Sequence, residues 1–187
     1  MTREELEHAI RAACDAAQDQ AVYVFGSQAI LGQYPDAPES LRQSAEADIS
    51  PVNAIDMVDV IDASLGELSS FHQAFGYYVH GVAITAAVLP QGWERRAIAV
   101  RNANTNGATG WCIEAHDLAA SKLVAHRDKD RDFVRILLAE GLVNASRLRL
   151  RVGQLPRSDR LPDELRGAIH RWLAGTVEDL DRASRRM

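Results

Sequence analysis

The sequence predicts an α+β fold, of the kind also described as α/β, with a helical C-terminal third. Two observations predict it. Short apolar runs of strand length alternate with amphipathic helical patterns as far as residue 115. Beyond that point only helical patterns follow, interrupted by a polar linker that contains two prolines. This order is typical of an α+β core followed by helices. We therefore expect a core over residues 1–115 and a helical region over residues 116–187 that packs on it.

The first elements follow from hydrophobic periodicity and helix capping. Residues 2–18 carry apolar side chains on one helical face, and Thr2 and Glu5 have the spacing of a capping box. Residues 21–25 form a short apolar run with β-branched and aromatic side chains, which predicts a buried strand. A turn and a short helical segment are expected next.

The remaining elements are predicted by the same patterns, together with the positions of glycine and proline. In the core we expect a loop at 32–43, a strand at 45–50, helices at 54–65 and 69–75, an extended segment at 77–87, and a hairpin of strands 97–101 and 111–114. In the C-terminal region we expect helices at 116–126, 128–140, 144–152 and 162–185.

Composition and charge exclude several classes of protein. The chain has 187 residues, a net charge of −5 and a pI of about 5.7, which argues against a broad, non-specific nucleic-acid binder. The N-terminus has no signal-peptide pattern, and no segment has the apolar length of a membrane helix. The two cysteines, Cys14 and Cys112, form no metal-binding motif. We expect a cytoplasmic protein that does not associate with membranes.

A turn able to bind phosphate comes directly after the first predicted strand. Gly26 lets the backbone approach a phosphate closely, and the next amides and the Ser27 hydroxyl can donate hydrogen bonds to it at a helix N-terminus. A tight turn without any ligand has the same sequence. Gly26 and Ser27 are candidate phosphate-binding residues.

Two carboxylates lie two residues apart in the second predicted strand. Alternate residues of a strand face the same side, so Glu46 and Asp48 are expected to project together while Ala47 packs on the other side. Neighbouring carboxylates repel each other, and a bound Mg²⁺ relieves the repulsion and can bridge to substrate phosphates. Glu46 and Asp48 are therefore candidate metal ligands and catalytic residues. The alternative is a solvated strand face.

A cationic segment begins the helical region. Lys122 lies between apolar neighbours, so its stem is expected to pack while its ammonium group reaches a specific partner, for which a triphosphate is a candidate. Lys122, His126 and Lys129 share one face if the helix is continuous. The alternative is a helix face that carries ordinary charge pairs.

Taken in order, these features resemble the nucleotidyltransferase superfamily. The resemblance rests on Gly26-Ser27, the carboxylate pair on the next strand, and the pattern Asp-Leu-x-x-x-Lys-Leu-x-Ala with a charged run at residues 117–132. It covers roughly residues 20–140. More closely, the chain resembles a branch of bacterial proteins related to the toxin-type nucleotidyltransferases of abortive-infection and toxin–antitoxin systems. The resemblance implies a mixed sheet flanked by helices.

The resemblance also implies an activity and a role for each matched residue. The reaction is Mg²⁺-dependent transfer of a nucleotidyl group from an NTP to a hydroxyl of RNA or protein, within a toxin–antitoxin or phage-defence system that supplies a partner protein from an adjacent gene. The residues implied to bind the nucleotide are Gly26, Ser27, Lys122 and Lys129, and those implied to hold the metal are Glu46 and Asp48, with Glu46, Asp48 and Lys122 catalytic.

The sequence departs from the superfamily pattern in ways that keep two alternatives open. The first acid of the pair is Glu46 where Asp is usual, and the predicted strand at 77–83 carries no third carboxylate. Its His80 is interpreted as a structural residue, and Glu114 is a candidate substitute for the missing acid. One alternative is a catalytically degenerate member that binds a nucleotide or a protein partner without turnover. The other is a structural subunit of a two-gene system.

Overall fold

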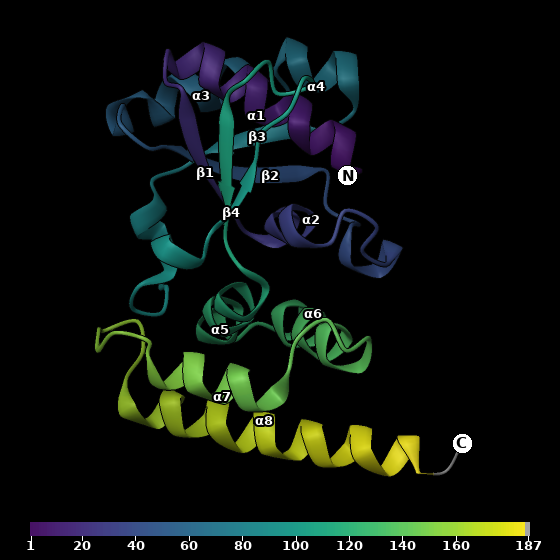
Figure 1. Cartoon of the computed structure of the whole chain (residues 1–187). Coiled ribbons are helices and arrows are strands. Elements are labelled where there is room, and N and C mark those ends of the chain that lie inside the picture. The colour runs from purple at the N-terminus through teal and green to yellow at the C-terminus, as the bar shows by residue number, and fades with distance from the viewer. Residues whose placement is uncertain (186–187) are drawn as a thin grey trace. The chain divides into compact units, whose positions relative to one another are not determined.

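The computed structural model describes residues 1–185 and divides into two compact units (Figure 1). The first unit comprises residues 1–87 and 94–114, and it contains the sheet. The second comprises residues 88–93 and 115–187 and is helical, although its last two residues lie outside the described part of the chain. The chain thus has an α+β part and a helical part, as the sequence predicts.

A five-stranded mixed sheet forms the centre of the first unit. Its strands are β1 (Ala21–Phe25), β2 (Glu46–Pro51), β3 (Tyr78–Gly81), β4 (Ile98–Val100) and β5 (Thr109–Cys112), in the order β3-β2-β1-β5-β4. Strand β1 is antiparallel to β2 and parallel to β5, β2 is parallel to β3, and β4 is antiparallel to β5. The predicted hairpin is the β4–β5 pair.

Four α-helices accompany the sheet in the first unit: α1 (Arg3–Ala17), α2 (Ile30–Gln33), α3 (Val58–Leu65) and α4 (Ser70–Phe75). The capping box predicted for α1 is present, since the Thr2 side chain accepts from the Glu5 amide and the Glu5 carboxylate accepts from the Thr2 amide. Helices α1 and α3 pack on the sheet and against each other.

The two faces of the sheet have different chemistry. The face toward the helices is apolar and fully buried, with Val22, Val24, Ala47, Ile49 and Val79 at 0% exposure. Because side chains alternate along a strand and paired strands share their faces, the opposite face of β2 and β3 carries Glu46, Asp48, Tyr78 and His80. Burial of one face therefore fixes which side chains the other face presents.

The prediction of an extended segment at 77–87 is only partly confirmed. Strand β3 ends at Gly81, and residues 84–86 form a single 3₁₀ turn. The Ser50 hydroxyl accepts from the Ile84 amide, and the Ala86 amide bonds back to the carbonyl of Ala83 at 2.8 Å. These hydrogen bonds outweigh the strand preference of the β-branched pair at 84–85.

Four helices make up most of the second unit: α5 (Ala115–Ala125), α6 (Asp128–Ala139), α7 (Ala145–Gly153) and α8 (Asp163–Ser184). Helix α5 contacts the other three, and most of its residues are buried. The continuous face considered for Lys122, His126 and Lys129 does not form. His126 has a φ of 54°, which ends α5 before α6 begins.

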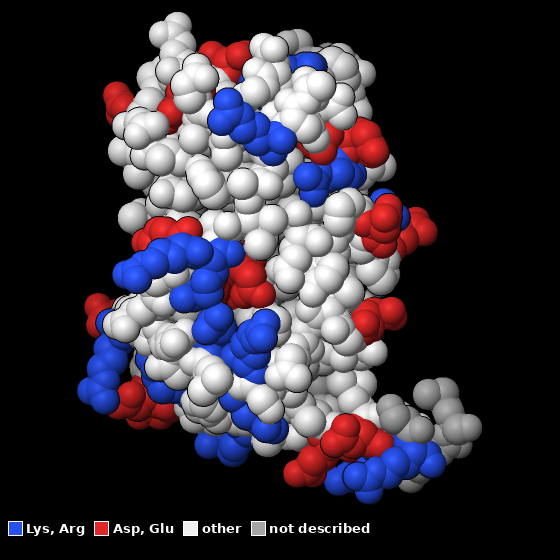
Figure 2. All heavy atoms as spheres, viewed as in Figure 1, with Lys and Arg blue, Asp and Glu red and all other residues white. Residues whose placement is uncertain are grey.

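Charge is divided unevenly between the two units. By sequence the first carries six Lys or Arg against fifteen Asp or Glu, whereas the second carries fifteen against eleven. On the face seen in Figure 2, Lys and Arg side chains gather mainly over the helices of the second unit. Within residues 1–185, the helices are all too short or too polar to cross a lipid bilayer.

Candidate metal and nucleotide site

Two neighbouring strands bring the acidic residues together with a histidine. Strand β2 carries Glu46 and Asp48 on the face away from the helices. The parallel register of β2 and β3 places Tyr78 beside Glu46 and His80 beside Asp48. The expectation that Glu46 and Asp48 project together agrees with this geometry.

The three polar groups lie close enough to share one ion. The Nδ1 atom of His80 lies 3.0 Å from Asp48 Oδ1 and 3.1 Å from Glu46 Oε1. One ligand atom from each of the three residues falls within 4.8 Å of the others. The Tyr78 hydroxyl donates to Glu46 Oε2 at 3.3 Å and so restrains the orientation of that carboxylate.

The electrostatics of the cluster show an excess of negative charge. Partial burial and the neighbouring Glu46 charge raise the pKa of Asp48 to about 6, although its contact with His80 opposes the rise. Desolvation alone would lower the pKa of His80, but the hydrogen bond and charge of Asp48, with the charge of Glu46, raise it. A cation at this position would therefore favour the ionised carboxylates.

Gly26 is required by the carboxylate next to it. Its φ is 69°, in the region that favours glycine, and a Cβ atom there would lie only 1.9 Å from Asp48 Oδ2. The absence of a side chain at Gly26 leaves room for the Asp48 carboxylate, and a role of Gly26 in phosphate binding stays a prediction. Gly26 thus brings the turn after β1 into direct contact with the acidic cluster.

Ser27 begins a short turn rather than a long helix. Residues 27–29 form one 3₁₀ turn that leads into α2, which is only four residues long. Such short helical segments have a small dipole, so the helix N-terminus adds little to anion binding here. The neighbouring Gln28 is fully buried, and its Nε2 donates to the carbonyl of Ser44 at 3.1 Å.

The two candidate lysines belong to the second unit. On α5, Lys122 Nζ lies 3.3 Å from Asp130 Oδ1 and 4.7 Å from the centre of the Phe133 ring. Its stem is packed, as predicted, and its ammonium group has a carboxylate partner on α6. Lys129 is exposed on α6. Both residues stay predictions as contacts of a triphosphate.

Two other acids from the sequence analysis, Asp117 and Glu114, lie outside the acidic cluster. Asp117 in α5 is fully buried, and its Oδ1 lies 3.0 Å from Nε of Arg151 in α7. This ion pair links two helices of the second unit. Glu114, considered as a third carboxylate, is not a member of the group formed by Glu46, Asp48 and His80.

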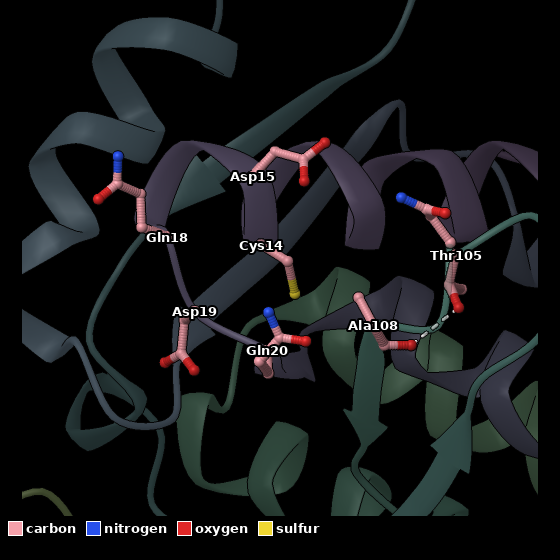
Figure 3. Close-up of a pocket in the computed structure, with 8 residues that line it drawn as sticks. Cys14, Asp15, Gln18, Asp19, Gln20, Thr105 and Ala108 are labelled. Carbon is pink, nitrogen blue, oxygen red and sulfur yellow. Dashed lines mark hydrogen bonds between the residues drawn. The ribbon is translucent and has the colours of Figure 1, made fainter.

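A separate pocket lies at the opposite end of β1, with a volume of about 340 Å³ (Figure 3). It is lined by Cys14, Asp15, Gln18, Asp19, Gln20, Thr105, Asn106 and Ala108. Burial, with the charges of Asp19 and Asp15, raises the pKa of the Cys14 thiol to about 12, so it is not a nucleophile at neutral pH. The Asp19 carboxylate is held by the amides of Asn53 and Ala54. This pocket lacks the chemistry of the acidic cluster.

His80 is the residue of the cluster whose neighbours the sequence did not reveal. A histidine on a strand is most often structural, and nothing local to residues 77–83 indicates which groups it faces. One signal was available: His80 and Tyr78 alternate in the strand after the acidic pair, where an acid was sought. The register of β2 and β3 places His80 in contact with both carboxylates.

The sheet, the acidic pair on its open face and the adjoining Gly-Ser turn define a nucleotidyltransferase-like protein. The chain matches, over residues 4–153, the model of a family described as a nucleotidyltransferase of unknown function (DUF6036), and it belongs to that family. The match takes in helices α1 to α7 and so extends beyond the segment on which the resemblance was based. Searches of curated proteins and of solved structures gave no match.

Proposed function

We propose that the protein transfers a nucleotidyl group from an NTP to a hydroxyl group, with a divalent cation held by Glu46 and Asp48. The observation that carries the proposal is the position of these two carboxylates, side by side on the open face of β2 and next to the Gly26 turn. Membership of a nucleotidyltransferase family supports the reaction class. The resemblance implies Mg²⁺ as the ion.

The residues present fit a divalent cation. Burial and the neighbouring Glu46 charge raise the pKa of Asp48, so a cation here would favour its ionised form, and oxygen donors of this kind suit hard cations. Such an ion, when bound, would neutralise charge on the phosphates of the substrate. Glu46 and Asp48 would hold it, and the Tyr78 hydroxyl would keep Glu46 oriented.

The proposed reaction needs positioning more than covalent chemistry from the protein. The acceptor hydroxyl oxygen forms a bond to the α-phosphorus, the bond from that phosphorus to the oxygen bridging the α- and β-phosphates breaks, pyrophosphate leaves, and the hydroxyl proton passes to solvent water. Gly26 and Ser27 are proposed to cradle the phosphates. Lys122 and Lys129 are proposed to contact the triphosphate, for which Lys122 would exchange its Asp130 partner.

We extend the proposal to the biological role that the resemblance implies. The acceptor would be a hydroxyl of RNA or of a protein, and the activity would belong to a toxin–antitoxin or phage-defence system with a partner encoded nearby. Expression of the protein alone would then slow bacterial growth, and expression of the Asp48→Ala variant would not. Equal growth in both cases would contradict the toxin role while leaving the reaction class open to direct assay.

A second candidate function is favoured by the imidazole in the cluster. His80 contacts both carboxylates, and the third acid of the superfamily pattern is not in the group. A site of this composition suits a catalytically degenerate protein that binds a nucleotide or a protein partner without turnover. Nucleotide binding with no transfer to any acceptor would support this alternative.

The experiment that tests the proposal is a calorimetric titration with each NTP, with and without Mg²⁺. We expect binding that requires the metal in the wild type and disappears in Asp48→Ala. Asp59→Ala is the matched control, because Asp59 is an exposed acid of α3 in the same unit. Absence of NTP binding by the folded wild type would overturn the enzyme proposal. If the wild type binds an NTP, label transfer from the α-labelled NTP would identify the acceptor.

A further inference from the structure

The acidic cluster contains a nitrogen donor in a position that its neighbours leave accessible. The His80 side chain is 45% exposed, with Glu46 at 36% and Asp48 at 26%. The ring nitrogen Nδ1 lies close to one oxygen of each carboxylate. Each of the three side chains therefore presents one donor atom to a common point that solvent ions can reach.

Two of the three separations between these donors, those from His80 Nδ1, match the spacing of atoms that share one metal ion. Ligands at about 2.1 Å from an octahedral ion lie roughly 3 Å apart along an edge. The two distances from His80 Nδ1, 3.0 Å and 3.1 Å, have this value. The same lengths also fit an ordinary ion pair between imidazolium and carboxylate, so the donor type has to decide what binds.

We propose that His80 is a metal ligand and that the site prefers a first-row transition ion of the Mn²⁺ class to Mg²⁺. Two carboxylates and one imidazole form a mixed donor set. Mg²⁺ favours oxygen ligands and retains its waters, whereas imidazole is a ligand of first-row transition ions such as Fe²⁺, Ni²⁺ and Zn²⁺. Mn²⁺ is the first and weakest member of that affinity series and also accepts carboxylates, so it serves as the probe of the class. The inference rests on the proposed function, because both use Glu46 and Asp48 as ligands, and it names the ion that the site selects.

Alignment of His80 with Asp48 supports this assignment. The β2–β3 register is fixed by burial of Ala47, Ile49 and Val79 on the other face, so His80 cannot be displaced from the carboxylates by a shift of one residue without exposing the core. The nitrogen donor is thus built into the sheet. A cation that enters the cluster meets all three groups.

The test compares metal affinities of the full chain at about pH 8, where competition by protons is weak. The dissociation constants of Mn²⁺ and Mg²⁺ are measured by calorimetry for the wild type, His80→Asp and His80→Ala. His170→Asp is the matched control, since His170 is an exposed histidine of α8. We expect His80→Asp to reduce the preference for Mn²⁺ over Mg²⁺ by about tenfold, because an oxygen donor that suits both ions replaces the nitrogen donor, and changes to the groups around a metal alter its affinity by about 10–100-fold.

A spectroscopic measurement gives a readout that does not depend on activity. Pulsed electron paramagnetic resonance of bound Mn²⁺ should show coupling to a nitrogen nucleus in the wild type and in His170→Asp. The coupling should vanish in His80→Ala, whose folding is checked by its melting temperature. Bound Mn²⁺ without nitrogen coupling, or an unchanged Mn²⁺-to-Mg²⁺ ratio in His80→Asp, would overturn the inference and show that His80 is an ion-pair partner only.

The outcomes separate this inference from the proposed function. Metal-dependent NTP binding without nitrogen coupling would retain the nucleotidyltransferase proposal and reject His80 as a ligand. Nitrogen-coupled Mn²⁺ without any NTP binding would retain His80 as a ligand and reject the enzyme. Absence of divalent-cation binding by the folded wild type would reject both.

Discussion

Two groups of acidic residues, one in each unit, have opposite surroundings. In the second unit the buried acids lie against cations: Asp117 against Arg151, and Asp130 against Lys122 and Arg127. In the first unit Glu46 and Asp48 lie against each other, and the imidazole of His80 contacts both. The ion pairs of the second unit join helices, whereas the two adjacent carboxylates of the first unit leave negative charge that a cation could neutralise.

The comparison shows how charge environment separates structural acids from candidate functional ones. An acid such as Asp19, whose hydrogen bonds lower its pKa in the folded chain, contributes to stability. An acid whose pKa is raised by burial and by a like charge, as that of Asp48 is, is held in an unfavourable environment. Such positions are frequent at binding and catalytic sites. Asp19 and Asp48 belong to the same unit, so the opposite shifts of their pKa values come from their immediate neighbours.

The largest effect is expected from removing a structural acid of the second unit. Asp117→Ala leaves Arg151 without its buried partner, and breaking such a pair costs about 3–5 kcal/mol in the free energy of unfolding. Urea unfolding followed by circular dichroism measures the loss. Asp128→Ala is the control, because the Asp128 side chain is 90% exposed, and it should change stability little. Similar losses of unfolding free energy in both variants would mean that the buried pair contributes no more to stability than an exposed acid does.

A smaller effect on stability, with a specific effect on binding, is expected from Gly26→Ala. The new Cβ would meet the Asp48 carboxylate, and the positive φ adds strain, for a combined cost of about 2–4 kcal/mol. Gly76→Ala is the matched control, since Gly76 has a φ of 76° but nothing within 4 Å of the added Cβ. We expect Mn²⁺ affinity by calorimetry to fall in Gly26→Ala and not in Gly76→Ala. Equal Mn²⁺ affinities in Gly26→Ala and Gly76→Ala would show that Gly26 does not affect the metal site.

The smallest effect is expected from Asp19, and it depends on pH. Burial would raise the pKa of Asp19, but hydrogen bonds from Asn53, Ala54 and Ala21 outweigh it and lower the pKa. A lowered pKa gives stability that is present above about pH 4 and is lost as the pH falls through the folded-state value. Asp19→Ala should therefore cost about 1–3 kcal/mol at neutral pH.

The pH dependence of unfolding checks the Asp19 prediction. Below about pH 4 the wild type should lose stability more steeply than Asp19→Ala, so the two curves converge in acid. Asp15→Ala, which removes an exposed acid of α1, should run parallel to the wild type. Curves for Asp19→Ala that stay parallel to the wild type at all pH values would show that its carboxylate is not stabilised by folding.

The sequence determined much of the local structure and the acidic half of the site. The capping box of α1, the buried strand at 21–25 and the hairpin follow from patterns within a few residues. Alternation along one strand places Glu46 and Asp48 on the same side. These features depend only on neighbours in the chain, so periodicity and residue type were enough to predict them.

Tertiary structure decided which distant residues meet. His80 joins the carboxylates because β3 packs parallel to β2 in a register set by the buried face, and Gly26 is needed because Asp48 lies against it. The pairing of Lys122 with Asp130 depends on how α6 folds back after the break at His126. Residue patterns show which side of a strand or helix is apolar, but contacts across 30 residues depend on packing of the whole core.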